Sequence, residues 1–239
     1  IVTGTLPNNK TILIDGAAKG ELTFDNVKVD AGSTGTAITI ALGTDIGIKG
    51  SLEAKTSDST APAIANNGSI TTTTDTNITA INSSDNTKGI SVSDGATLLL
   101  TDGSTLTTSG INNATGGTVV ARKGSNVSNS TSGGSDLLSV TITSPDNGNT
   151  LTVKAGNITI ASGDKVTENT SLTLTATPAA NYSLEKITVT SENGSATDIA
   201  NNAGYTIETA AISIAASFKY NPPYIPPVTS YYTVTLPSV

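Results

Sequence analysis

The sequence predicts an all-β chain in two parts: a short parallel β-helix of about five rungs with three strands per rung, and a smaller β-rich domain after it. No stretch of the 239 residues has the apolar spacing of an amphipathic helix. Short runs of alternating apolar and polar residues, such as 38–40 and 172–174, lie between Gly, Asn and Asp, as strands do. One apolar pattern also recurs through the first half, which indicates a repeat architecture.

Each repeat unit has a leading Ile, a second apolar residue after a Gly, and a third apolar residue. The three sets are Ile12, Ile38, Ile64, Ile90 and Ile111; Leu22, Ile46, Ile70, Leu98 and Val119; and Val27, Leu52, Ile78, Leu106 and Val127. The leading Ile residues are 26, 26, 26 and 21 positions apart. No unit can bury its apolar side alone, so we expect the units to stack at about 4.8 Å per layer into ladders of Ile, Leu and Val.

The connections between strands also fit this arrangement. Corners with positive φ are expected at Gly16, Gly95, Gly103, Gly116 and Gly117. The Asp-Gly pairs 15–16, 94–95 and 102–103 also suit antiparallel hairpins, but hairpins do not require a three-part motif that recurs five times. The longest connections, 54–63 and 82–89, are expected to project from one side, where repeat scaffolds place ligand-binding groups. Residues 1–6 and the segment near Val127 are expected to cover the open strand edges.

The character of the sequence changes at Leu137. The polar tract 125–135 predicts a weak last rung and a flexible joint. Strands are expected at 138–143, 151–154, 157–160, 171–176, 184–190, 205–208 and 212–219. Residues 221–227, NPPYIPP, predict a stiff extended spacer, and 231–236 resembles 138–142 and is expected to open a further module. The predicted organisation is therefore a β-helix over 1–136, a β domain over 137–220 and a Pro-rich linker over 221–239.

Three phrases of the second part resemble a divergent internalin-type B-repeat module of bacterial surface proteins: VTITSPDNGNTLTV (140–153), ASGDKVTENTSLTLTATPAANYSLEKITV (161–189) and GYTIETAAISIAASF (204–218). Asn181 precedes Tyr182 where the family usually has Gly, and Lys186-Ile187 replaces its usual Trp. The first part is similar to right-handed parallel β-helix repeat regions of such proteins. The resemblance implies a rigid spacer or adhesion module and transfers no site residue.

Composition excludes several kinds of chemistry. The chain has no His and no Cys, which excludes a Ser-His-Asp triad, a Cys-His pair and an ordinary zinc site. A net charge of −7 and a pI near 4.4 disfavour nucleic acid and anionic membrane surfaces. No run of 18 apolar residues is present, so we expect no membrane insertion within this chain.

The predicted coil contains three further candidate sites. A polysaccharide lyase would need a base such as Arg122, beside Lys123, near clustered carboxylates, but the candidate carboxylates Asp45, Asp75, Asp94 and Asp102 do not share one repeat position. Asp94 and Asp102 with nearby carbonyls are a candidate calcium site, although the spacing favours plain turns. An exposed hydroxyl array suited to ice is a third alternative, formed by Thr71–Thr74, Thr76, Thr79, Thr105, Thr107 and Thr108.

These observations favour a non-catalytic structural or adhesion segment of a larger secreted or cell-surface bacterial protein, which acts as a spacer and display scaffold. Two alternatives stay open: a carbohydrate-binding module that uses the corner loops, and a degenerate polysaccharide lyase. We expect no enzyme activity, no catalytic or metal-binding residues and no cofactor; the ligand-binding residues are not identified. The expected partners are surface glycans or proteins, and we do not expect nucleic acid to bind. We expect a monomer that is extracellular or at the cell surface, with an export signal that lies outside this sequence.

Overall fold

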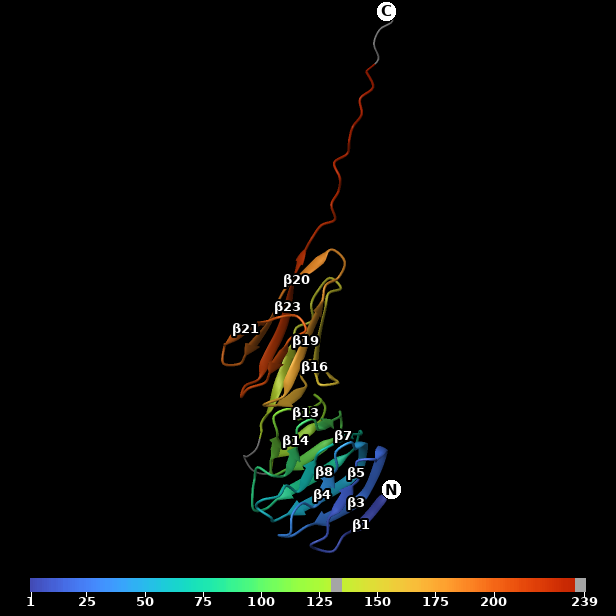
Figure 1. Cartoon of the computed structure of the whole chain (residues 1–239), viewed down its shortest axis with the longest axis vertical. Coiled ribbons are helices and arrows are strands. Elements are labelled where there is room, and N and C mark those ends of the chain that lie inside the picture. The colour runs from blue at the N-terminus through green and yellow to red at the C-terminus, as the bar shows by residue number, and fades with distance from the viewer. Residues whose placement is uncertain (130–134, 235–239) are drawn as a thin grey trace, which may run out of the picture.

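The structure is a computed structural model, and it describes residues 1–129 and 135–234. It is elongated, with the N-terminal part at one end, a second β-rich part in the middle and an extended tail at the other end (Figure 1). The described ranges contain β-strands and no helix, so the predicted all-β class is confirmed. Within these ranges there is accordingly no helix long and apolar enough to cross a membrane.

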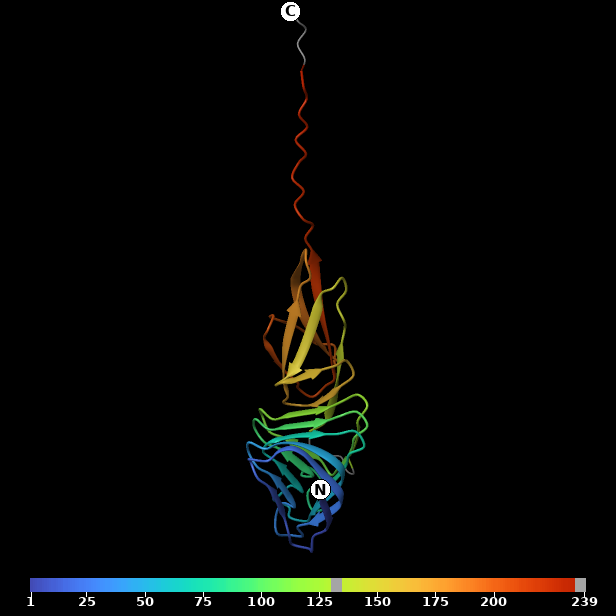
Figure 2. The same cartoon turned by 90° about the vertical axis from the view of Figure 1, so that its right-hand side faces the viewer.

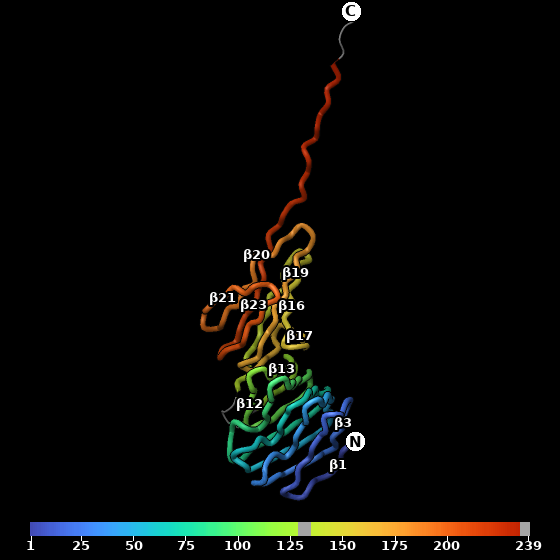
Figure 3. The backbone as a smooth tube through the Cα atoms, in the orientation of Figure 1, coloured from blue at the N-terminus to red at the C-terminus, as the bar shows by residue number. Residues whose placement is uncertain are grey.

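The N-terminal part is a β-solenoid of about four turns, because five strands on a face enclose four complete turns. Its chain path is a coil with three faces (Figures 2 and 3). The first face contains the front halves of β3 (Lys19–Asp30) and β5 (Asp45–Thr56), then β7 (Ser69–Thr72), β10 (Thr97–Leu100) and β13 (Thr118–Ala121). The second contains β2 (Ile12–Ile14), β4 (Ile38–Ile40), β6 (Ile64–Asn66), β9 (Ile90–Val92) and β12 (Ile111–Asn113). The third contains the back halves of β3 and β5, then β8 (Asn77–Asn82), β11 (Thr105–Thr108) and β14 (Asn126–Asn129).

All strand pairs within the solenoid are parallel, so the hairpin alternative is wrong. The predicted ladder of leading Ile residues and the ladder of third apolar residues are both present in register. The middle ladder departs from the prediction at its first member. Leu22 pairs with Ile48, and Gly20 occupies the position opposite Ile46. The shift is two residues, so Leu22 still faces the interior, since side chains alternate with period two.

Two long strands bend to serve two faces each. In β5 the bend lies at Gly50, whose φ is 90°, and a Cβ there would stand 2.2 Å from the carbonyl oxygen of Phe24. Both the left-handed backbone and the close approach require glycine at this position. Phe24, the one aromatic residue before Tyr182, is 1% exposed and belongs to the core, as expected from its alternating surroundings.

Corner glycines follow the prediction in part. Positive φ occurs at Gly95, Gly103 and Gly116, but not at Gly16 and Gly117. At the last two positions the requirement is space, because a Cβ would lie 2.1 Å from the backbone of the next turn at Gly16 and 2.4 Å from a buried amide at Gly117.

The second part packs two sheets face to face. One contains β18 (Lys165–Thr167), β15 (Leu137–Ile142), β23 (Ile212–Tyr220), β20 (Tyr182–Ser191) and β21 (Ala196–Ile199). The other contains β17 (Ile158–Ile160), β16 (Thr150–Ala155), β19 (Ser171–Thr177) and β22 (Gly204–Thr206). Their inner faces form a core that includes Val140, Val153, Leu172, Leu174, Val189 and Ile214. We call this part the module; β18 and β21 were not predicted, because neither has more than one strongly apolar position.

The module closes the end of the solenoid. Strand β18 pairs antiparallel with β13, with Val166 opposite Val120, and on its other side it pairs with β15. The first face of the solenoid therefore continues into a sheet of the module. Residues 130–134 of the predicted flexible joint lie outside the described residues. The two parts are joined by the pairing of β13 with β18. The predicted boundary at 136 and 137 lies between β14 and β15.

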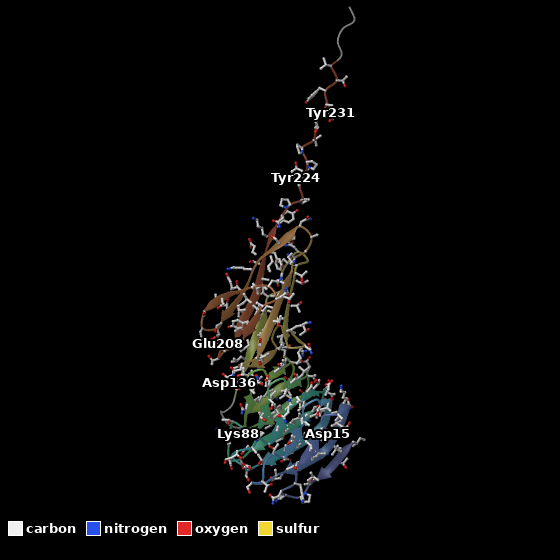
Figure 4. All side chains as sticks on the ribbon, viewed as in Figure 1. Asp15, Lys88, Asp136, Glu208, Tyr224 and Tyr231 are labelled. Atoms are coloured by element: carbon white, nitrogen blue, oxygen red, sulfur yellow. The ribbon has the colours of Figure 1, made fainter. Side chains whose placement is uncertain are left out.

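At the opposite end, β1 (Val2–Thr5) pairs with β3 and covers its edge, as expected for residues 1–6. Strand β14, the segment near Val127, is the last strand of the third face and covers the edge of β11. The tail begins where the Asn221 amide donates to the carbonyl of Asn181, and residues 221–234 form no regular element. Its side chains project from an extended backbone, as Figure 4 shows at Tyr224 and Tyr231.

Candidate functional site

Three stacked loops project from one corner of the solenoid, between the third and second faces. They consist of residues 31–37, 57–63 and 83–89, and we call them the corner loops. This is the side on which the two long connections were expected. Figure 4 places Lys88, at the end of the third loop, on the opposite side of the solenoid from Asp15, which lies at a tight corner.

The second and third loops contain the same Asp-x-Thr device. Oδ1 of Asp58 accepts hydrogen bonds from the amide and the hydroxyl of Thr60, at 2.8 and 2.6 Å. Oδ1 of Asp85 accepts the same pair from Thr87, at 2.9 and 2.7 Å. An Asp carboxylate that accepts a hydrogen bond from the backbone amide two residues ahead stabilises a tight turn. Each of these two loops is therefore stabilised by its own local hydrogen bonds.

The loops are also tied to one another. Buried Asn82 donates through Nδ2 to the carbonyls of Asp58 and Ala61, both at 2.8 Å. Nζ of Lys88 lies 2.9 Å from a carboxylate oxygen of Asp85 and donates to the carbonyl of Ser59 at 2.9 Å. The corner loops are therefore an ordered surface, with hydrogen bonds that run from turn to turn.

These contacts determine the charge state of the loop carboxylates. The hydroxyl of Thr87 and then the ammonium of Lys88 lower the pKa of Asp85 to about 2. The hydroxyl and the amide of Thr60 lower the pKa of Asp58 in the same direction. Hydrogen bonds to the charged form favour that form, so both side chains are carboxylates at neutral pH and neither suits the role of a general acid.

A hollow of about 390 Å³ lies beside the third loop, because the last turn has only Ser109 and Gly110 in place of a loop. The residues that line it are Ile81, Asn82, Ser83, Ser84, Asp85, Asn86 and Ser109. Hydroxyl and amide groups predominate, and no aromatic ring is among them. This surface suits weak hydrogen bonding to a hydroxylated ligand and offers no platform on which a sugar ring can stack.

The candidate lyase residues lie apart and are engaged elsewhere. Arg122 forms an ion pair of 2.6 Å with Asp164 of the module and donates to the carbonyl of Thr159 at 2.7 Å. Lys123 is exposed, and its backbone amide also donates to Asp164, at 3.1 Å. Sequence reasoning missed Asp164, since its role depends on a contact 42 residues distant along the chain.

The carboxylates considered for catalysis or calcium do not converge. Asp45 begins β5, and Asp75 lies in a turn with φ of 64°. Oδ1 of Asp102 accepts the amide of Gly124 on the next turn at 2.8 Å, and Asp94 lies at another corner, against Gly116. Within the ranges that the structure describes, no three acidic residues come close enough to hold one metal ion.

The predicted threonine array is interrupted. Thr72, Thr76 and Thr108 are at most 2% exposed, because Thr72 and Thr108 occupy inward positions at the ends of strands and Thr76 lies in the buried turn before β8. Outward positions are retained by Thr71, Thr79, Thr105 and Thr107, and of these four Thr79 and Thr107 are paired neighbours on the third face. A flat exposed lattice of the expected set is therefore not formed.

A protein-family model, that of the divergent InlB B-repeat domain, matches residues 149–222. This match confirms the resemblance on which the module was interpreted, and it extends from the residue before β16 to the first residues of the tail. The β-solenoid confirms the other predicted resemblance, that of the first part to a parallel β-helix repeat region. Neither the curated proteins nor the solved structures gave a significant match to the chain.

Proposed function

We propose that this chain is a non-catalytic spacer and display segment of a bacterial cell-surface protein. The family match supports the location, because B-repeat domains of the InlB type are typical of bacterial surface proteins. The observation that carries the spacer role is the pairing of β13 with β18, which joins the solenoid and the module into one continuous sheet. A spacer needs this kind of connection, since a joint without packed contacts transmits neither distance nor orientation.

Display is the second half of the proposal. The corner loops present hydroxyls, amides and two carboxylates on one side of a stiff support, away from both ends of the chain. Loops that a rigid scaffold positions are the usual carriers of recognition. The proposed occupant is a surface glycan or protein of the bacterium or its host.

Shortening a loop tests display. The variant replaces residues 83–89 with the two-residue connection Ser109–Gly110 that the last turn already uses, so the coil has a natural model for the change. We expect this variant to remain folded. We also expect it to lose the binding of glycans or proteins that the unchanged chain captures from extracts of bacterial or host surfaces. The matched control is Thr97→Ala, which changes a partly exposed, outward-facing residue of the first face. Equal retention by all three proteins would leave the spacer role alone.

A second candidate is glycan binding in the hollow beside the third loop. Its support is the lining of hydroxyl and amide groups within about 390 Å³. A glycan array read at millimolar sensitivity tests it, and the absence of any signal that depends on residues 83–89 would remove it.

A further inference from the structure

The end of the module farthest from the solenoid contains a groove that combines aromatic rings with unused polar groups. The groove measures about 260 Å³ and is open to solvent where the tail leaves the module. One wall consists of the ends of β20 and β23, and the other is the loop 143–149. The groove belongs to the module, whereas the corner loops belong to the solenoid. A function of the groove is therefore independent of the function proposed above.

The aromatic wall follows from strand register. Tyr182 lies opposite Tyr220, and Leu184 lies opposite Phe218, so these side chains share one face of the β20–β23 pair. The rings of Tyr182 and Tyr220 are 5.2 Å apart and tilted by 55°. Tyr182 and Phe218 are only half-buried, because the facing sheet of the module ends before this point. The apolar face of the module therefore continues past its covered core into an open groove.

The polar wall is held in place by a buried amide. Asn149, 7% exposed, accepts the amide of Ala179 at 2.8 Å and donates to the backbone carbonyl of Asp146 at 2.7 Å. It thereby fixes the loop 143–149 against the turn before Tyr182. A groove whose two walls are fixed before binding loses less entropy when a ligand enters.

The polar side chains of this wall are available. Within the described part of the chain, neither the carboxylate of Asp146 nor the amide of Asn147 forms a hydrogen bond or an ion pair, and both residues are exposed. Ser144 adds a hydroxyl to the same lining. Groups that accept and donate hydrogen bonds therefore face half-buried rings across a short gap.

We infer that this groove binds a neutral oligosaccharide. A pyranose has an apolar face that packs on aromatic rings and an edge of hydroxyls that requires donors and acceptors. Charge decides between classes of glycan, because the lining contains the Asp146 carboxylate and no Lys or Arg, and the whole chain carries −7. Uronic acids, sulfated sugars and phosphate groups would be repelled there.

Isothermal titration calorimetry with cellohexaose and chitohexaose tests the inference, with an oligogalacturonate as the acidic comparison. We expect a neutral oligosaccharide to bind and the acidic one to fail. Tyr182→Ala should lower the affinity about tenfold and Tyr182→Phe by less than about threefold, since the ring provides most of the contact. Asp146→Ala changes an exposed loop residue and should weaken binding without affecting folding. The matched control, Tyr224→Ala, removes an aromatic residue of the tail that is 83% exposed and should change nothing.

Three results would overturn the inference. The first is no heat or chemical-shift change with either neutral probe at millimolar concentration. The second is binding that Tyr182→Ala and Asp146→Ala leave intact. The third is self-association in sedimentation that Tyr182→Ala abolishes, because the groove would then hold the Pro-rich tail of a second copy, as aromatic grooves hold polyproline segments.

Discussion

The carboxylate of Asp164 connects the module to the solenoid, and Asp164→Ala should weaken that connection by about 3 kcal/mol. Oδ2 lies 2.6 Å from Nη1 of Arg122 and 2.9 Å from the amide of Ala161, while Oδ1 accepts the amide of Lys123 at 3.1 Å. The carboxylate therefore ties the last corner of the solenoid to the turn that precedes β18.

The magnitude follows from burial. The side chain of Asp164 is 3% exposed and that of Arg122 is 26% exposed. Removing one member of a buried pair usually costs about 3 to 5 kcal/mol, because the other charge stays desolvated. Arg122 keeps some contact with water and its hydrogen bond to Thr159, so the lower end of that range applies. Asp198→Ala is the control, since its partner Lys186 and Asp198 are both more than half exposed and such pairs add little.

The distribution of tyrosine provides the assay. All six Tyr lie from Tyr182 onward, so tyrosine fluorescence reports on the module and the tail, whereas far-ultraviolet circular dichroism also reports on the solenoid. In urea we expect the two signals of the wild type to coincide and those of Asp164→Ala to separate. Separate transitions in the wild type, or an unchanged midpoint by both signals in the variant, would refute the reasoning.

Three other predictions concern the solenoid. Leu98→Ala leaves a cavity in the middle ladder and should lower the free energy of unfolding by about 3 kcal/mol in urea; a loss below about 1 kcal/mol would mean that the coil is loosely packed. Gly50→Ala should lower the melting temperature by several degrees because of its positive φ and close backbone, whereas Gly47→Ala, with contacts of 3.7 Å, should not; equal effects would contradict this. An NMR titration should give Asp85 a pKa of about 2, raised toward 3.8 by Lys88→Ala. The pKa of Asp85 is lower in the folded chain than in the unfolded chain, so the charged carboxylate stabilises the fold fully above about pH 4. This stabilisation is lost as the pH falls toward 2. An Asp85 that titrates near 3.8 in both proteins would exclude the proposed contacts.

The sequence predicted the solenoid well because its signal is local and repeated. Ile38, Ile64 and Ile90 recur at equal spacing, and equal spacing in a stacked coil places like residues in one ladder. Leu22 was assigned to the wrong ladder position because the first turn has a Gly at the place that apolar residues occupy in later turns. The corner loops were located from length alone, although the repeated Asp-x-Thr was readable as a turn device.

The junction and the groove were beyond the reach of sequence patterns. Strand β18 has three residues, and only Val166 is strongly apolar, so it gives no alternating signal. Its pairing with β13 joins segments 46 residues apart, as Val120 and Val166 show, and such a distance leaves no periodicity to detect. The position of Tyr182 across the groove from Asp146 depends on how the loop 143–149 packs against the end of β20, which no sequence pattern shows.

The central claim is that solenoid and module form one stiff unit, and a distance measurement between them tests it most directly. The chain has no Cys, so Ser59→Cys and Asn193→Cys introduce a unique pair of exposed sites for spin labels. Double electron–electron resonance should give one narrow distance distribution, which broadens when Asp164→Ala is added. A broad or multiple distribution in the protein without the Asp164 change would contradict the claim.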